Sequence, residues 1–320
     1  MRVLRILAIA LLTVWAAAAL YFDLNPIAAG AYVLVVVALY IFIKGGWRAF
    51  GAALAVWVSV LVWWLSLRPS NDRPWQPDVA RTAWAEIDGD QVTFHNYRNC
   101  DYRTETDYTP VWETKTVRFS DLRGVDIAID YWGSPWMAHP IVSFRFGDDD
   151  HVAFSIETRK EVGESYSAIL GFFRQYELIY LVGDERDFIR VRTNYRKGED
   201  IYLYRLNIKP TEVRQRFDEY IARMNELHTS PAWYNALTTN CTTSIRSQSA
   251  ASERAPFDWR IIANGKMDEL FYERGWIDRS IPFATLKEHA HINERAHAAN
   301  DAPDFSRRIR EGNPSLSQNP

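Results

Sequence analysis

The chain has 320 residues and a formal net charge of -3 at pH 7, with 37 Lys and Arg against 40 Asp and Glu. This balance gives no reason to expect a nucleic-acid partner, and its two cysteines are too few for a disulfide framework. A chain of this length forms one sizeable domain with appendages, or two domains. We find no Gly-rich phosphate loop and no Cys/His cluster with metal-ligand spacing, so neither a cofactor nor a metal is predicted.

The first 67 residues differ from the rest by three apolar runs, at residues 3–22, 27–43 and 49–67. A helix of about 20 apolar residues crosses a hydrocarbon core of about 30 Å. We therefore predict a membrane anchor of three transmembrane helices over residues 1–67. The alternative is a cleaved signal peptide followed by a hairpin, although the first run has no clear cleavage site and is long for a signal core.

Positive charges in the short connections predict the orientation of these helices. Arg2 and Arg5 flank the first run, the turn at residues 23–26 carries no positive charge, and the turn at residues 44–48 carries two. The positive-inside rule then places the N-terminus and the second turn in the cytoplasm, and the residues after the third run outside it. In a bacterium this means an inner-membrane protein with a soluble domain in the periplasm.

A linker at residues 68–79 is predicted to join the anchor to a soluble domain at residues 80–297. Its three prolines among polar residues indicate an extended chain. Residues 80–130 alternate in a strand-like way and form a β-rich section, and residues 139–260 form the core that carries the candidate catalytic groups. Residues 298–320 are polar and rich in Asn, Ser and Pro, so a disordered tail is expected there.

A β-hairpin is predicted within residues 139–159. If its apolar residues share one face, period-two alternation places four polar side chains on the other: His139, Ser143, Ser155 and Glu157. A three-residue loop sets His139 directly across from Glu157. A four-residue loop breaks that pairing, and the sequence leaves both registers open.

After the hairpin we predict a helix within residues 160–176, strands at residues 177–182, 188–193 and 200–206, and an amphipathic helix capped by Thr211. Four arginines alternate with acidic residues in this stretch and are predicted to lie on a solvated strand edge: Arg186, Arg190, Arg192 and Arg196.

Cys241 lies in the polar turn Asn240-Cys241-Thr242, which opens a predicted helix. A thiol at a helix N-terminus faces unpaired backbone N–H groups and the positive end of the dipole, so its thiolate is favoured. The alternative is a small core residue at a helix start, because free cysteines are usually buried. Cys100 lies in a strand-like stretch and is predicted to be structural.

Several phrases of residues 74–297 together resemble the N-terminal periplasmic domain of Lnb-type lipoprotein N-acyltransferases. They include His139-Pro-Ile-Val-Ser-Phe-Arg-Phe, Ser155-Ile-Glu-Thr-Arg, Gly171-Phe-Phe-Arg and Trp233-Tyr-Asn-Ala-Leu-Thr-Thr-Asn-Cys-Thr-Thr. The resemblance implies an α+β fold of the permuted papain-like type, related to NlpC-like cysteine hydrolases and acyltransferases. In that fold the histidine strand precedes the cysteine helix, as in this chain.

The resemblance implies that Cys241 is the nucleophile and His139 the base, and we assign Glu157 to orient the imidazole. A nucleophilic thiol needs a nearby base and benefits from a third group that fixes its tautomer. Backbone N–H groups at the helix start would stabilise an oxyanion. Three further residues are expected to support the oxyanion or the site: Asn240, Thr242 and Ser155.

The function favoured by these residues is that of a membrane-anchored cysteine enzyme, a thiol acyltransferase with a membrane lipid or lipoprotein substrate. A cell-wall amidase or endopeptidase is the second hypothesis, since the same groups hydrolyse amides when water is the acceptor. The third is a non-catalytic membrane module that binds an envelope partner. No particular protein partner is predicted.

Overall fold

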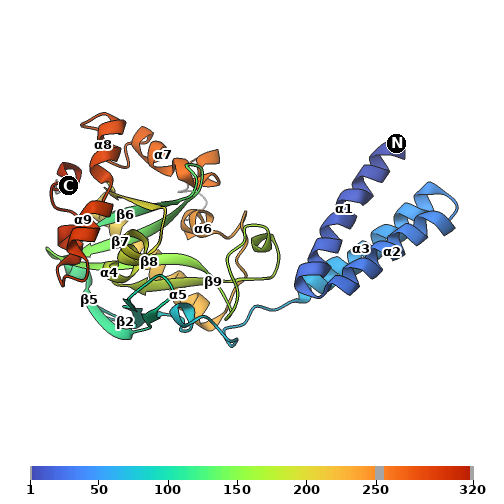
Figure 1. The fold of residues 1–320 in the computed structure, drawn as a ribbon, viewed down its shortest axis with the longest axis horizontal. Coiled ribbons are helices and arrows are strands. Elements are labelled where there is room, and N and C mark those ends of the chain that lie inside the picture. Colours follow the sequence, from blue (N-terminus) through green and yellow to red (C-terminus); the bar gives the residue numbers. More distant parts are fainter. Residues whose placement is uncertain (1, 249–255, 318–320) are drawn as a thin grey trace. The chain divides into compact units, whose positions relative to one another are not determined.

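A computed structural model describes residues 2–248 and 256–317 of the chain, which divides into two units. The first, here the apolar-helix unit, comprises Met1–Ser70, Ser165–Glu177 and Trp233–Ala236. The second, here the sheet unit, comprises Asn71–Glu164, Leu178–Ala232 and Leu237–Pro320 (Figure 1).

The apolar-helix unit contains three helices, α1 (Arg2–Asp23), α2 (Pro26–Phe42) and α3 (Gly46–Ser66). Within α1 and α3, segments of 21 residues each are long and apolar enough to cross a membrane, whereas α2 has only 17 residues. Asn25 caps α2 by accepting a hydrogen bond from the Ala28 N–H at 2.9 Å. The three predicted apolar helices are therefore present, and the number of membrane crossings stays a prediction.

Asp23, at the end of α1, links the helices of this unit to its later segments. Its carboxylate accepts hydrogen bonds from Trp64 Nε1 at 2.7 Å and from Gln175 Nε2 at 2.7 Å. The Arg174 guanidinium lies 4.2 Å from the Trp64 ring centroid, and the rings of Phe22 and Phe173 are in contact. The segment Ser165–Glu177 is thus fastened to the ends of α1 and α3.

The sheet unit is built on a mixed eight-stranded sheet with the order β1-β2-β9-β8-β7-β6-β10, in which β5 also pairs with β2. Its strands are β1 (Trp84–Asp88), β2 (Gln91–Arg98), β5 (Trp112–Arg118), β6 (Leu122–Trp132), β7 (Ala138–Phe146), β8 (Asp150–Arg159), β9 (Glu177–Gly183) and β10 (Glu199–Arg205). The short strands β3 (Asp101–Tyr102) and β4 (Tyr108–Thr109) form a separate pair. β2 and β9 run parallel, whereas β6, β7 and β8 are antiparallel.

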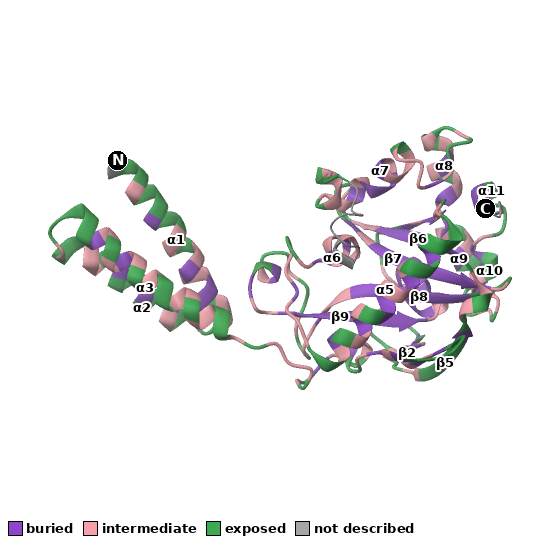
Figure 2. Cartoon of the chain, turned by 180° about the vertical axis from the view of Figure 1, so that it is seen from behind, coloured by how far each residue is buried: buried purple, intermediate pink, exposed green. Residues whose placement is uncertain are grey.

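Helices cover both faces of this sheet, so its central strands are buried on both sides (Figure 2). On one face α5 (Pro210–Thr229) inserts Phe217, whose ring lies 4.9 Å from that of Phe144 and 6.3 Å from that of Phe154. The opposite face packs against α4 (Glu185–Arg190), α9 (Asn293–Ala299) and α10 (Phe305–Arg308). The remaining helices are α6 (Cys241–Gln248), α7 (Met267–Glu273), α8 (Phe283–Ala290) and α11 (Pro314–Ser317). The unit is therefore a mixed α+β domain.

β7 and β8 form the predicted hairpin, and its register settles which residues face one another. The loop holds three residues, 147–149, and Ile141 pairs with Ser155 further along the ladder. Two residues further along each strand, the same register sets His139 across from Glu157. The three-residue alternative is therefore confirmed.

The strand predicted at residues 188–193 is wrong, because this segment is helical. Asp184 caps α4 by accepting a hydrogen bond from the Arg186 N–H at 2.8 Å, and a π-helical turn follows at Val191–Tyr195. Helical spacing buries Arg190 and Arg192, so the prediction of a solvated strand edge is also wrong for these two arginines.

The helix predicted within residues 160–176 is wrong as well, since the only helical turn in this range is of the 3-10 type, at Leu170–Phe172. Gly163 has a φ of +91°, so the charged start of this range forms a turn and not a helix.

The disordered tail predicted for residues 298–320 is corrected by the structure up to residue 317, and residues 318–320 lie outside the described residues. Phe305 and Ile309 are buried in the core cluster, and Arg310, whose side chain is 10 % exposed, pairs with Glu185 at 2.6 Å and Asp126 at 2.9 Å. This segment is polar on average, but its few large apolar side chains, Phe305, Ile309 and Leu316, are buried.

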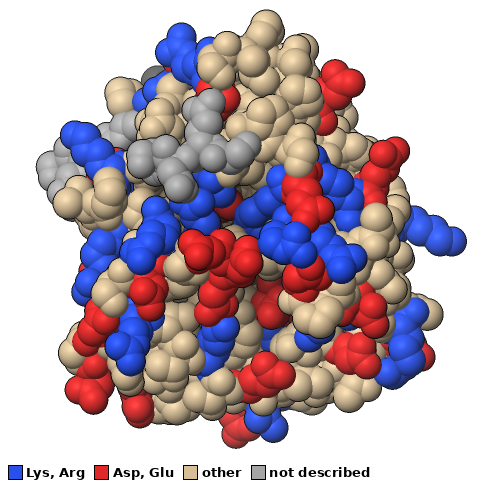
Figure 3. Space-filling model, turned by 90° about the vertical axis from the view of Figure 1, so that its left-hand side faces the viewer, with Lys and Arg blue, Asp and Glu red and all other residues tan. Residues whose placement is uncertain are grey.

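On the face shown in Figure 3, basic and acidic side chains are interleaved over the surface.

Candidate functional site

α6 begins at Cys241, and the residues around it fix the helix start. Asn240 Oδ1 accepts a hydrogen bond from the Thr243 N–H at 2.8 Å, and Thr243 Oγ1 accepts one from the Asn240 N–H at 2.9 Å. This reciprocal pair satisfies N–H groups that a helix start otherwise leaves unpaired. Cys241 itself is half-buried, so its thiol lies at the helix N-terminus with access from outside.

His139, on β7, is connected to the polar side chains of Ser155 and Glu157. Its Nε2 lies 2.7 Å from Ser155 Oγ and 3.2 Å from Glu157 Oε1, and Ser155 Oγ donates to Glu157 Oε1 at 2.6 Å. The side chain of Cys241 is among the groups that raise the pKa of His139, so the thiol lies close to the imidazole. The imidazole thus contacts the Ser155 hydroxyl and the Glu157 carboxylate and lies close to the thiol.

The charges of His139 and Glu157 stabilise each other. Burial lowers the pKa of His139, but the Glu157 carboxylate and the hydrogen bonds to Cys241 and Glu157 outweigh it and raise this pKa to about 10. Burial disfavours the charged Glu157, yet the imidazolium and the Arg192 guanidinium hold its pKa well below the usual range. His139 is therefore protonated at neutral pH.

Arg192 lies behind the histidine and bridges two carboxylates. Its Nη2 donates to Glu157 Oε1 at 2.8 Å, and its Nε lies 3.1 Å from Asp130 Oδ2, on the strand residue that pairs with His139. Burial, and then the charge of Asp130, raise the pKa of nearby Glu199 to about 7. The sequence analysis missed this role, because it placed Arg192 on a solvated strand edge, whereas the residue lies in a buried helical turn.

Asn264 is a second residue to which the sequence analysis gave no role at this site. Its Nδ2 lies 3.7 Å from Cys241 Sγ and donates to Thr242 Oγ1 at 3.2 Å, while its Oδ1 accepts from the Ala138 N–H at 2.8 Å. The side chain thus joins the cysteine helix to the start of the histidine strand.

The structure brings together all six residues singled out from the sequence. His139 and Glu157 are in contact, Ser155 is hydrogen-bonded to both, Cys241 lies close to His139, and Thr242 Oγ1 lies 3.7 Å from Cys241 Sγ. Asn240 stabilises the helix start. Over residues 2–248 and 256–317, no group of three or more His, Cys, Asp or Glu side chains has a geometry that would hold a metal ion.

The comparisons with known proteins can now be set beside this geometry. Residues 108–265 match the family model described as the Lnb N-terminal periplasmic domain, a stretch that includes every site residue described above. No curated protein and no solved structure matches the chain. With its apolar N-terminal helices, the chain is a membrane protein with a periplasmic domain, and its residues 108–265 belong to the Lnb N-terminal periplasmic domain family.

Proposed function

We propose that this protein is a membrane-anchored thiol acyltransferase that acts on lipid or lipoprotein acyl groups. Three N-terminal helices would anchor it in the bacterial inner membrane, with the N-terminus in the cytoplasm and the sheet unit in the periplasm. The sheet unit would be a permuted papain-like domain, in which the histidine strand β7 precedes the cysteine helix α6.

The observation that carries this proposal is the placement of His139 with both Cys241 and Glu157. The Glu157 carboxylate lies 3.2 Å from the imidazole, and both residues raise the pKa of His139, so the base is charged and oriented. This is the arrangement by which cysteine enzymes make a thiolate nucleophile near neutral pH.

The first half-reaction follows from these positions. The Cys241 thiolate attacks the carbonyl carbon of an acyl ester, and the carbonyl π electrons move onto the oxygen. When the carbonyl re-forms, the ester C–O bond breaks and the leaving alkoxide takes the proton of the His139 imidazolium. The products are a thioester on Cys241 and a free alcohol.

The second half-reaction reverses these roles. A neutral amine attacks the thioester carbonyl, His139 takes a proton from the amine nitrogen, and the thiolate leaves with the electrons of the C–S bond. The product is an amide, and the imidazolium–thiolate pair is restored. Water in place of the amine would give a carboxylic acid, which is the chemistry of the alternative amidase or endopeptidase.

Exposed apolar side chains beside the site favour an acyl substrate over a cell-wall peptide. We define the apolar rim as four side chains that are 44–54 % exposed: Trp136, Met137, Trp259 and Ile262. The rings of Trp136 and Trp259 lie 6.2 Å apart, and the Trp136 carbonyl accepts from the Gly265 N–H, one residue after Asn264. An apolar surface next to a reactive thiol fits a hydrocarbon chain.

The proposal is tested with purified full-length protein in vesicles of diacyl phospholipid whose acyl chains are deuterium-labelled. A lipid-modified peptide with a free α-amino group is added as the acceptor, and products are identified by mass spectrometry. We expect labelled acyl groups in amide linkage to the peptide, and none with Cys241→Ala. Label found only as free fatty acid would indicate hydrolysis in place of transfer, and no Cys241-dependent product of either kind would contradict the acyltransferase.

A further inference from the structure

We propose that Asn264 is a catalytic residue, which donates a hydrogen bond from its side-chain amide to the oxyanion formed when Cys241 attacks an acyl group. This assignment rests on the proposed function and adds to it. It starts from the contact of Asn264 Nδ2 with Cys241 Sγ at 3.7 Å, which places an amide donor beside the reacting atom.

The orientation of this amide is fixed by its other end. The Ala138 N–H donates to Asn264 Oδ1 at 2.8 Å, so the amide NH₂ points the other way, toward Cys241 and Thr242. The flipped amide would set two N–H donors against each other at Ala138 and turn a lone pair toward the thiolate. The donor direction is therefore set by the backbone.

The neighbouring glycine explains why the amide reaches this place. A Cβ on Gly265 would lie 2.5 Å from the Pro135 carbonyl oxygen and 2.5 Å from the Trp136 carbonyl carbon, so only glycine fits there. Gly265 N also donates to Trp136 O at 3.1 Å. The turn is thus pressed against the segment that leads directly into His139, and one short segment positions both the base and the amide.

The distance suits the proposed chemistry. In the tetrahedral adduct the oxyanion oxygen is two bonds from Sγ, so a donor 3.7 Å from Sγ can lie within the about 2.7–3.1 Å that oxyanion donors require. As the thiolate forms the S–C bond, the carbonyl π electrons become a lone pair on this oxygen. Asn264 and the backbone N–H groups at the start of α6 then stabilise its charge until the C–O bond breaks.

A purely structural role for Asn264 makes a different prediction. If the side chain only tied α6 to β7, its loss would weaken every reaction of the Cys241 thiol alike. An oxyanion donor acts only where an oxyanion forms. Acylation by an ester forms one, whereas alkylation by iodoacetamide displaces iodide at a saturated carbon and forms none.

The experiment compares these two reactions in the detergent-solubilised full-length protein. Acylation is followed by the release of p-nitrophenolate from p-nitrophenyl octanoate, and alkylation of Cys241 by peptide mass spectrometry. The variants are Asn264→Ala and Asn264→Leu, of which the second keeps most of the side-chain volume, with Asn207→Ala as a control at an exposed asparagine. Thermal melting followed by circular dichroism checks that each variant is folded.

We expect both Asn264 variants to lose acylation by about 10²–10³-fold, as for other oxyanion donors, while alkylation changes by less than about threefold. Asn207→Ala should match the wild type in both reactions. Acylation at the wild-type rate in the Asn264 variants, or equal losses in both reactions, would overturn the assignment while leaving the proposed function intact. A wild-type protein whose Cys241 is alkylated but never acylated would reject the proposed function itself, and the assignment with it.

Discussion

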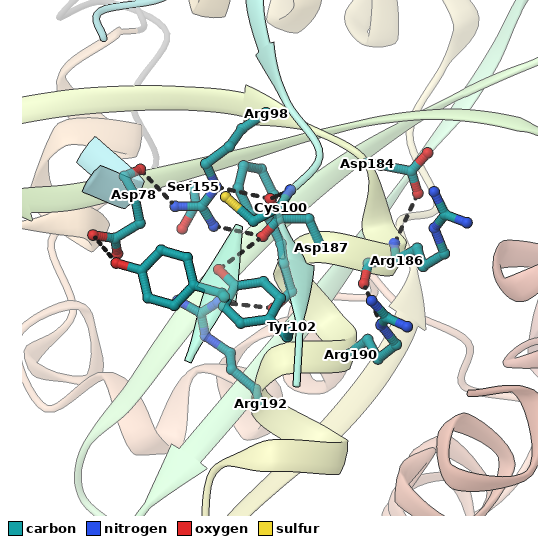
Figure 4. Close-up of polar contacts among 12 residues, drawn as sticks. Asp78, Arg98, Cys100, Tyr102, Ser155, Asp184, Arg186, Asp187, Arg190 and Arg192 are labelled. Atoms are coloured by element: carbon teal, nitrogen blue, oxygen red, sulfur yellow. Dashed lines mark hydrogen bonds and ion pairs between the residues drawn. The ribbon is translucent and has the colours of Figure 1, made fainter. Parts of the chain in front are cut away.

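The chain has two cysteines, and a buried network of a carboxylate and an arginine lies near each, but the two networks differ in how the carboxylate is paired. Asp187 accepts from the Cys100 N–H at 2.7 Å and forms two hydrogen bonds with Arg98, at 2.9 and 2.7 Å (Figure 4). Its charge is therefore paired with the guanidinium. At Cys241 the carboxylate of Glu157 instead contacts an imidazole that also contacts the thiol.

The surroundings of the two thiols differ accordingly. Burial, and then the charge of Asp187, raise the pKa of Cys100 to about 12, so this thiol stays neutral. Cys241 is half-buried and lies beside His139, whose raised pKa keeps the imidazole protonated at neutral pH. The two thiols therefore differ in the group that pairs with the neighbouring carboxylate, which is a guanidinium at Cys100 and an imidazole at Cys241.

The largest expected effect on turnover comes from removing the thiol of each cysteine in turn. Cys241→Ala should lower turnover by about 10⁴-fold or more, because the attacking atom is lost. Cys100→Ala should leave turnover within about twofold and lower the free energy of unfolding by about 1–2 kcal/mol, for a small loss of buried packing. Turnover is measured with p-nitrophenyl octanoate, and equal losses in both variants would break the comparison.

Removal of the base should be nearly as severe. His139→Ala leaves Glu157 without its imidazolium and Cys241 without a proton partner, so we expect turnover to fall by about 10³-fold or more. His291→Ala removes a histidine that is 35 % exposed and pairs with Asp200, and serves as the matched control. Activity in His139→Ala close to that of the control would show that another group acts as the base.

The orienting carboxylate should matter less. Glu157→Gln removes the charge but keeps an oxygen for the Ser155 hydroxyl, so turnover should fall by about 10–100-fold, less than for the base. Glu86→Gln, at a glutamate that is 64 % exposed, is the control. In this variant the pKa of His139 should fall, and the pH profile of turnover should shift with it, because the carboxylate is the main group that raises this pKa. An unchanged pH profile together with unchanged turnover would place the third group elsewhere.

The smallest effect concerns stability against pH. The pKa of His139 is about 10 in the folded chain, against about 6.5 for a free imidazole, so the folded state binds the proton more tightly. The stabilisation is complete below about pH 6.5 and is lost as the pH rises through about 10. The melting temperature of the wild type minus that of His139→Gln should therefore decrease over this range, and a difference that grows with pH would contradict the account.

The sequence alone predicted the hairpin and the cysteine helix well, because both depend on local patterns. Alternation along residues 139–159 placed His139 and Glu157 on one face, and the polar turn at Asn240 placed Cys241 at a helix start. Only the loop length was left open, since three- and four-residue loops have similar sequences.

The missed features depend on contacts between distant segments. Asn264 reaches Cys241 because its glycine neighbour packs against the backbone before His139, and no local pattern encodes that contact. In the helical segment after β9, Arg192 is buried and pairs with Asp130 and Glu157. The alternation of basic and acidic residues in the sequence does not distinguish such a buried helical segment from a solvated strand edge. The C-terminal segment is ordered by pairing Arg310 with buried carboxylates more than 100 residues earlier in the chain.

The most direct test of the difference between the two thiols is peptide-resolved mass spectrometry of the full-length protein after brief exposure to p-nitrophenyl octanoate. The account predicts an octanoyl group on the peptide that contains Cys241, removable by hydroxylamine as a thioester is, and none on the peptide that contains Cys100. A Cys241 thiol that stays unmodified, or octanoyl groups found equally on both cysteines, would contradict the claim that His139 and Glu157 make Cys241 the nucleophile.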